Sequence, residues 1–330
     1  MLTRRRFVTA AAGAGMTCGL MHLSMPARAQ TVAKPARMLV GFPPGGSIDA
    51  VARLLVEQMQ GYAPSIIVDN RPGAGGRLAL EALKGSAPDG SVIAITPGDQ
   101  LTLFPHIYSR LSYKPLEDFA PVGTICSVEF LLAIGPMVPA SVQTLADFIA
   151  WCRQNPSLAS YGTAGAGTRP HFLGAALARA ANFEFAHLPY KGNALAIQNL
   201  LGSHVAANIS TIGNALPHVR SGALRALATT APSRSAALAD VPTFREAGYP
   251  TVEAVEWFGL LVPAQTPGSV IAALHAALLG VLATAEVKAG LMKLSLQGAT
   301  ASPAEFAELI KTDTQRWAEV VKASGFSSLE

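Results

Sequence analysis

The chain has 330 residues, of which 50% are hydrophobic and 14% are charged, and its formal net charge is +4. Four of the 25 basic residues and none of the 21 acidic ones fall within residues 1–29, so the remainder carries 21 of each. Without surplus positive charge or a run of Lys and Arg, this remainder is a poor partner for nucleic acid or an anionic membrane surface. It is long enough for two domains of ordinary size.

Residues 1–29 have the pattern of an export signal. Arg4, Arg5 and Arg6 precede a short apolar run rich in Ala and Gly, and Ala27-Arg28-Ala29 offers the small residues that a signal peptidase reads. The Thr-Arg-Arg-x-Phe arrangement indicates a twin-arginine signal, with an ordinary Sec signal as the alternative. The apolar run is too short to span a bilayer. We therefore expect cleavage after about Ala29 and a mature protein in the periplasm.

The chain that follows alternates strand and helix patterns. Strand patterns at 38–42, 65–68 and 91–96 are separated by helix patterns that begin at Ile48 and cover 77–84. This β-α-β-α-β order predicts an α/β fold in which helices cover the faces of a parallel sheet.

A second unit of the same kind begins near Phe119. It starts with a long strand pattern at 120–134, and a helix capped by Thr144 with Asp147 in the capping-box position follows. The remaining patterns are strands at 159–163, 185–188, 204–209 and 224–229 and helices that end near 177 and cover 193–201 and 213–220.

The last part of the chain is mainly helical after an apolar run at 252–262. Helix patterns cover 268–284 and 285–295, and a final helix opens with a capping box from Ser302 to Glu305. A chain end that returned to the first unit would make that domain discontinuous.

Motifs for catalysis or metal binding are missing from this sequence. It has no Gly-x-Ser-x-Gly elbow, no His-Glu-x-x-His, no Cys-x-x-Cys and no Walker loop. Its seven histidines are scattered, so we expect neither a metal nor a cofactor. Two cysteines remain beyond the signal, Cys126 and Cys152, either bridged in an oxidising compartment or left as two buried thiols.

Two loops of small residues, each between a strand and a helix, carry the functional signal. Gly45 and Gly46 in the first loop, and Gly165 in the second, leave backbone N–H groups unscreened next to a helix N-terminus, which attracts carboxylates and phosphates. Either loop alone could be no more than a tight turn. Two such loops at the carboxyl ends of strands, where open α/β sheets bind ligands, favour a carboxylate site.

Several other residues near these loops could have either a structural or a ligand-binding role. Asp49 could cap amides of its own helix or accept a hydrogen bond from a ligand, and His171 could be structural or ligand-binding. Lys191 could pair with a ligand anion or stay solvated. The glycine-rich segment 70–76 is interpreted as mainly architectural, and Trp257 with Phe258 as mainly packing.

Motifs spread in order over nearly the whole mature chain resemble the substrate-binding receptors of tripartite tricarboxylate transporters, the Bug or TctC-like proteins. Each motif is weak alone, and together they are specific. They are the segments 40–49, 68–76, 87–90, 161–168 with His171, 189–192, 215–218, 224–228, 240–243 and 257–260.

The resemblance implies a two-lobed periplasmic-binding-protein (Venus-flytrap, type II-like) fold, with a helix-flanked central sheet in each lobe and the ligand between them. The expected organisation is a signal at 1–29, lobe 1 from 30–125 plus 254–330, and lobe 2 from 126–253.

Carried over by position, the resemblance also implies a ligand-binding set. Ser210 and Thr211 stand near where the family commonly has Asp-Asn, which favours a ligand with an uncharged or aromatic tail over an amino acid. The first-lobe members are Phe42, Gly45, Gly46, Ser47, Asp49 and Thr96, and the second-lobe members are Thr163, Ala164, Gly165, Thr168, His171, Ser210 and Thr211.

The function expected from the residues and the resemblance is that of a receptor, without catalytic residues, that closes by hinge motion on a small carboxylate. The ligand would pass to the permease subunits of the transporter, and we expect a monomer. Two alternatives are a ligand sensor for a membrane signalling partner and, less favoured, a cleft hydrolase that uses Asp49 with His171.

Overall fold

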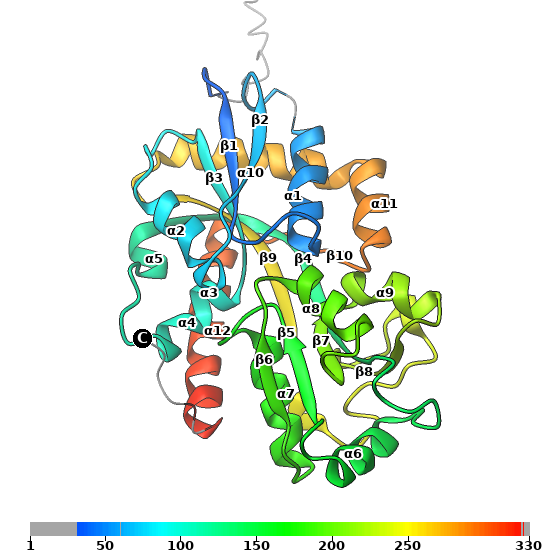
Figure 1. Cartoon of the computed structure of the whole chain (residues 1–330). Coiled ribbons are helices and arrows are strands. Elements are labelled where there is room, and N and C mark those ends of the chain that lie inside the picture. The colour runs from blue at the N-terminus through cyan, green and yellow to red at the C-terminus, as the bar shows by residue number, and fades with distance from the viewer. Residues whose placement is uncertain (1–31, 60, 325, 327–330) are drawn as a thin grey trace, which may run out of the picture.

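The computed structural model describes residues 32–59, 61–324 and 326, so the predicted signal at 1–29 lies outside the described residues. The molecule has two α/β lobes, one above the other in Figure 1, which we call lobe 1 and lobe 2. Their strands form one continuous sheet in the order β2-β1-β3-β9-β4-β7-β5-β6, and β8 and β10 also pair with β4.

Lobe 1 is built on three parallel strands, β1 (Ala36–Val40), β2 (Ile66–Asn70) and β3 (Val92–Pro97), joined by β9 (Val255–Pro263) antiparallel to β3. The predicted strand at 38–42 ends earlier, so Gly41 and Phe42 belong to the loop. The helices of this lobe are α1 (Ser47–Gln58), α2 (Arg77–Lys84), α3 (Asp99–Thr102), α4 (Phe104–Ile107), α5 (Pro115–Asp118), α10 (Gly268–Ala283), α11 (Ala285–Lys293) and α12 (Pro303–Ser324).

Lobe 2 repeats the parallel arrangement with shorter strands. Its strands are β5 (Ser160–Thr163), β6 (Ala186–Pro189), β7 (Ala207–Thr211) and β8 (Arg225–Thr229), and its helices are α6 (Leu145–Gln154), α7 (Arg169–Ala180), α8 (Asn193–Leu201) and α9 (Ile212–Arg220). The predicted capping box of α6 is confirmed, because Thr144 and Asp147 exchange both hydrogen bonds.

The strand β4 (Phe119–Ile134) connects the lobes. Its first part, up to Glu129, pairs with β9, and its last part, from Phe130, pairs with β7 and β8. Short β10 (Gln297–Gly298) pairs with β4 at Cys126 and Ser127. The pairing of β4 therefore passes from lobe 1 to lobe 2 near Glu129, Phe130 and Val255.

Each lobe has its own apolar core. Met38, Val51 and Leu260 belong to the core between the lobe 1 sheet and α1 and α10, and Phe148, Tyr161 and Ile209 belong to the lobe 2 core. The two cysteines are free and buried in different cores, Cys126 in lobe 1 and Cys152 in lobe 2, so the thiol reading holds. The predicted lobe bounds near 125 and 254 stay a prediction.

The chain end returns to the first unit, as the discontinuous arrangement requires. The helix α12 buries Phe306, Ile310 and Trp317, and its capping box from Ser302 to Glu305 is present. The short helices α3, α4 and α5 were not predicted, because four residues are too few to display a helical period. Within the described residues no single helix is long and apolar enough to span a membrane, although the bent pair α10–α11 qualifies by length and composition.

Candidate functional site: the cleft between the lobes

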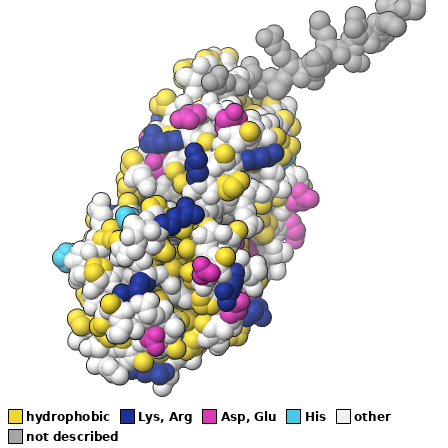
Figure 2. Space-filling view, turned by 90° about the vertical axis from the view of Figure 1, so that its right-hand side faces the viewer, with side chains coloured by type: hydrophobic (Ala, Val, Ile, Leu, Met, Phe, Trp, Pro, Cys, Tyr) yellow, Lys and Arg dark blue, Asp and Glu magenta, His cyan; other side chains and the backbone are white. Residues whose placement is uncertain are grey.

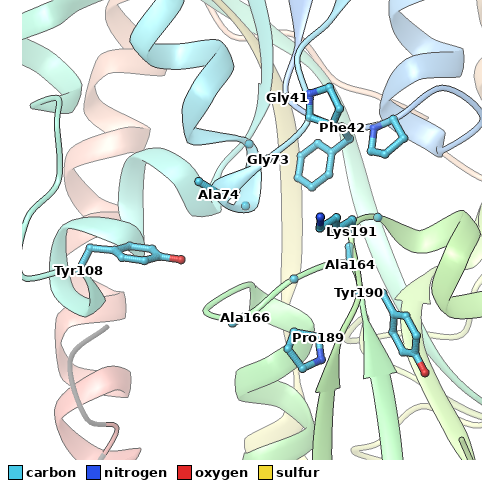
Figure 3. Close-up of a pocket in the computed structure, with 16 residues that line it drawn as sticks. Gly41, Phe42, Gly73, Ala74, Tyr108, Ala164, Ala166, Pro189, Tyr190 and Lys191 are labelled. Atoms are coloured by element: carbon cyan, nitrogen blue, oxygen red, sulfur yellow. The ribbon is translucent and has the colours of Figure 1, made fainter. Parts of the chain in front are cut away.

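A cavity of about 270 Å³, which we call the main cavity, lies in the cleft where loops of both lobes meet, beside a larger outer cavity of about 370 Å³. Figure 3 shows Phe42, Gly73 and Ala74 of lobe 1 on one side and Ala164 and Lys191 of lobe 2 facing them. The lobes approach closely here: a Cβ added to Gly165 would lie 3.9 Å from the Cα of Gly75.

The first predicted loop, 43–47, is largely occupied by the protein itself. The amide of Gly45 donates to Oδ2 of Asp49 (3.0 Å), and the amide of Ser47 donates to Oδ1 of Asn214 in lobe 2 (3.2 Å). The hydroxyls of Ser47 and Thr211 are 2.8 Å apart, which ties the start of α1 to the end of β7. Of this loop only Pro43 lines the main cavity, together with the preceding Phe42.

Asp49 belongs to the structure of that loop. Besides Gly45 it accepts hydrogen bonds from Arg53 and from the side-chain amide of Asn70, and it is 3% exposed. Burial opposes ionisation, yet the hydrogen bonds from Arg53, Gly45 and Asn70 together hold its pKa below the usual value. These contacts correspond to the capping role, and Asp49 lines none of the cleft cavities described here.

The second predicted loop, 163–168, borders the main cavity directly. Ala164, Gly165 and Ala166 line it. The carbonyl of Gly165 accepts hydrogen bonds from the hydroxyls of Thr163 (3.0 Å) and Thr168 (2.9 Å), which folds the loop back on itself. The amides of Ala164 and Ala166 have no acceptor in the described part of the chain.

The stacked imidazole rings of His171 and His187 form hydrogen bonds with this loop. The rings of His171 and His187 lie 3.7 Å apart, Nδ1 of His171 accepts the amide of Gly167 (3.1 Å), and Nε2 of His187 is 2.7 Å from the hydroxyl of Thr163. Burial lowers the pKa of His171 to about 4, and burial together with His171 lowers that of His187 to about 3. Both are therefore neutral near pH 7, and neither lines the main cavity.

The glycine-rich segment 72–76 forms the lobe 1 wall of the cavity, although the sequence suggested a mainly architectural role. Gly75 and Gly76 have positive φ (66° and 94°), which only glycine adopts without strain. The amides of Ala74 and Gly75 have no acceptor among the described residues. Residues whose main-chain amides have no acceptor among the described residues thus line the cavity from both lobes.

Lys191 is the one basic side chain among the described residues that line the cleft cavities. It is exposed, and it stands between the main cavity and an outer one of about 370 Å³ bordered by Gly46 and Asn193. On the face shown in Figure 2, basic and acidic side chains are interspersed with hydrophobic ones. The described part of this face therefore has no extensive region of positive charge, and Lys191 is the local positive charge at the cleft cavities.

A small cavity of about 50 Å³ adjoins the main one and shares Phe42, Gly75 and Ala164 with it. Its polar wall includes Asp99, Glu256 and Thr168. Asp99 and Glu256 are 3% and 4% exposed, and Oδ1 of Asp99 lies 2.9 Å from Nε of the buried Arg169. Burial and the charge of Asp99 raise the pKa of Glu256 well above its usual value.

Sequence reasoning did not find this acidic group. Glu256 offered the one available signal, because it is the only charged residue in the apolar run at 255–263, and a charge in a buried strand needs partners. Nothing in the sequence connected it with Asp99 or Arg169.

The remaining predicted site residues lie behind the loops. Thr96 is buried at the end of β3 and bonds to Gln100, whose side chain in turn donates to the carbonyl of Gly75 (2.9 Å). Ser210 is fully buried, and its hydroxyl has no hydrogen-bond partner in the described structure. Asp49 and His171, the pair that a hydrolase would use, are each engaged with protein groups. Among the described residues no cluster of three potential metal ligands is present.

Comparisons with known proteins agree with this architecture. The family model described as "Tripartite tricarboxylate transporter family receptor" matches residues 51–326. Protein BugT of Bordetella pertussis is 34% identical over 94% of this chain and 96% of its own length.

Solved structures extend the likeness to three dimensions. The periplasmic binding protein BugD superposes with a TM-score of 0.85 at 28% identity, over 90% of this chain and 99% of its own. Rpa4515 of R. palustris, solved with adipate, gives a TM-score of 0.85 at 27% identity over the same shares of the two chains. The chain therefore belongs to the tripartite tricarboxylate transporter receptor family, whose members are binding proteins and not enzymes.

Proposed function

We propose that this chain is a periplasmic receptor that captures a small carboxylate between its lobes and delivers it to the permease of a tripartite tricarboxylate transporter. One observation carries the proposal: main-chain amides without a protein acceptor line a single cavity from both sides, Ala74 and Gly75 in lobe 1 and Ala164 and Ala166 in lobe 2. Hydrogen bonds from such donors to a carboxylate are charge-assisted and contribute about 1.5–3 kcal/mol each.

The size and lining of the cavity favour a small molecule. Its volume of about 270 Å³ is at the lower end of ligand pockets. Most of the lining is backbone, Pro and aromatic side chain, with Lys191 as the local cation. The relative Rpa4515 was solved with the six-carbon dicarboxylate adipate, which supports a ligand of this class.

The predicted helix-terminus sites are not the proposed carboxylate position. At α1, Asp49 and Asn214 accept the amides of Gly45 and Ser47, and at α7 Asp99 accepts the amide of Arg169 (2.6 Å). Protein oxygens already satisfy these three donors. The amide of Gly46 has no acceptor among the described residues, but Gly46 lines only the outer cavity. A carboxylate in the main cavity is therefore proposed to bind the free amides of the 72–76 and 163–168 loops.

Closure and export complete the proposed cycle. The Ser47–Thr211 contact joins the lobes beside the cleft, and β4 and β9 supply hinge strands, so a closed form trapping a ligand is mechanically available. The sequence pattern at 1–29 supports export. The permease as partner rests on the family to which the chain belongs.

A thermal-shift screen tests the proposal. Mono-, di- and tricarboxylates, aromatic acids and matched amines and sugars are added to the mature protein at millimolar concentration. We expect at least one carboxylate to stabilise the native state, by about 2.7 kcal/mol at 100 times its dissociation constant. Stabilisation by sugars or amines alone, with every carboxylate silent, would overturn it.

The variant Gly165→Val tests whether the stabilising carboxylate binds in the cleft. The valine would project at Gly75 across the cavity, whereas within its own lobe the nearest atom to a Cβ is Cγ2 of Thr168 at 3.6 Å. We expect carboxylate binding to disappear while the fold persists. Gly280→Val, in open space on α10, is the matched control and should bind like the wild type.

A further inference from the structure

Arg169, the first residue of α7, connects lobe 2 to three elements of lobe 1. It follows the 163–168 loop directly and is 1% exposed. Three acidic side chains lie around its guanidinium: Asp99 on α3, Glu256 on β9 and Asp313 on α12. A fully buried arginine requires such partners, because an unpaired buried charge is strongly unfavourable.

Asp99 holds both the backbone and the side chain of Arg169. Its Oδ2 accepts the main-chain N–H of Arg169 at 2.6 Å, and its Oδ1 accepts Nε at 2.9 Å. The amide of Asp99 in turn donates to Oε1 of Glu256 at 3.1 Å. One carboxylate therefore fixes the position of the α7 start, and with it the end of the 163–168 loop, relative to lobe 1.

The other donors of the guanidinium also reach lobe 1. Nη1 donates to the carbonyl of Val255 (2.6 Å) in the hinge strand, and Nη2 lies 3.4 Å from Oδ2 of Asp313. That carboxylate also accepts Nε1–H of Trp257 (2.9 Å), and the guanidinium lies 4.9 Å from the ring centre of Trp317. The guanidinium of Arg169 is planar and its N–H groups point in fixed directions. Because several of them meet acceptors in lobe 1, they favour one orientation of the two lobes.

An apolar contact could hold the lobes together equally well. One lies alongside, where Phe172 of α7 packs with Phe104 and Trp317. Buried ion pairs add little net stability compared with apolar packing, and they are demanding in geometry. The contribution of the Arg169 cluster is therefore expected in the precision of lobe placement more than in stability.

We propose that Asp99 and Arg169 are positioning residues for ligand binding, which set the 163–168 loop against the 72–76 loop. The inference rests on the proposed function, because it assumes that the ligand binds between these loops. It adds that ligand affinity depends on the Asp99–Arg169 contact, because this contact sets the distance and orientation of the 163–168 loop relative to lobe 1.

Asp99→Asn tests the proposal, with Asp313→Asn as the matched control. Asn has one acceptor oxygen where Asp99 uses two, so one of the bonds to Arg169 is lost. The control removes the same charge from the same arginine without touching its main-chain N–H. Nitroxide labels at Leu158→Cys and Leu279→Cys, two exposed sites in lobe 2 and lobe 1, report the interlobe distance without any ligand.

We expect Asp99→Asn to broaden or shift the interlobe distance distribution, and Asp313→Asn to leave it as in the wild type. In calorimetric titrations with adipate we expect about tenfold weaker binding for Asp99→Asn and less than about threefold for the control. Should Asp99→Asn fail to fold, Arg169→Lys takes its place, since it keeps the charge and the main-chain bond but loses the fork. Broadening is expected there too.

An unchanged distance distribution in Asp99→Asn, or equal broadening in both variants, would overturn the positioning role. A purely structural role would lower the melting temperature of the variants and leave the distance distribution and adipate affinity alone. If the wild type binds no carboxylate, the proposed function fails, whereas the label distances still decide the role of Asp99.

Discussion

At the residue scale, Lys191 is the side chain that most directly links charge to the proposed ligand. It is exposed at the mouth of the main cavity and stands between that cavity and the outer one. An exposed cation interacts with an anion through water, so its contribution is modest and is screened by salt.

Lys191→Met should raise the dissociation constant of a carboxylate about fivefold at low ionic strength, from the loss of about 1 kcal/mol. The difference should shrink in high salt. Calorimetric titrations at two salt concentrations measure both effects. Lys288→Met, in the surface groove beside α11, is the control and should leave binding unchanged. A Lys191→Met protein with wild-type affinity at low salt would remove the lysine from the site.

At the scale of elements, β9 carries a buried acid whose protonation the structure determines. Burial and the charge of Asp99 raise the pKa of Glu256, and the charge of Arg169 only partly offsets this rise. Asp313 is the other acidic group near that arginine. In the unfolded chain the same group has its ordinary pKa near 4.5. Between these two values the folded state holds a proton that the unfolded state releases, so stability from this group falls as pH rises.

Glu256→Gln should remove that part of the pH dependence. The amide can donate and accept where the protonated carboxyl does, and it cannot ionise. We expect the stability of the variant relative to the wild type to increase as the pH rises above the ordinary glutamate pKa of 4.5, as the linkage relation requires. Urea unfolding at several pH values measures the difference. Parallel curves for the two proteins would show that Glu256 does not change protonation on folding.

A second element prediction concerns the capping box of α6, far from the cleft. Thr144 accepts the amide of Asp147 at 3.1 Å, and Asp147 accepts the amide of Thr144 at 3.0 Å. Thr144→Ala should lower the free energy of unfolding by about 1 kcal/mol. Carboxylate affinity should stay as in the wild type, and thermal shifts with and without ligand check both statements. A changed affinity would mean that α6 is coupled to the cleft.

At the scale of the whole molecule, the two cysteines lie in separate apolar cores. Cys126 and Cys152 are buried in different lobes, and burial raises the pKa of each thiol to about 12. The protein should therefore show the same melting temperature with and without reductant, and both thiols should react only after unfolding. Thiol counting in urea measures this, and a reductant-sensitive transition would contradict it.

The helix and strand order was predictable because it depends on local periodicity. The helix at 77–84 and the helix at 193–201 agree with the structure residue for residue, and the long strand at 120–134 differs from β4 by one residue. Of the two loops that line the main cavity, 163–168 was predicted as a ligand loop because glycines next to a strand end need no tertiary information to be recognised, whereas 72–76 was interpreted as mainly architectural. The sequence did not show which backbone amides of these loops lack a hydrogen-bond acceptor in the protein.

The sequence by itself determined the α/β alternation, the zero net charge beyond the signal pattern, the family, and the two small-residue loops. Only the tertiary structure decided that Asp49, Asn214 and Asp99 occupy the helix N-termini, that the 72–76 loop forms the opposite wall, and that Arg169 joins the lobes. The physical reason is that a hydrogen-bond donor has a limited capacity. Whether it serves a ligand or the protein depends on which acceptor the fold brings within about 3 Å, and those acceptors lie up to 167 residues away along the chain.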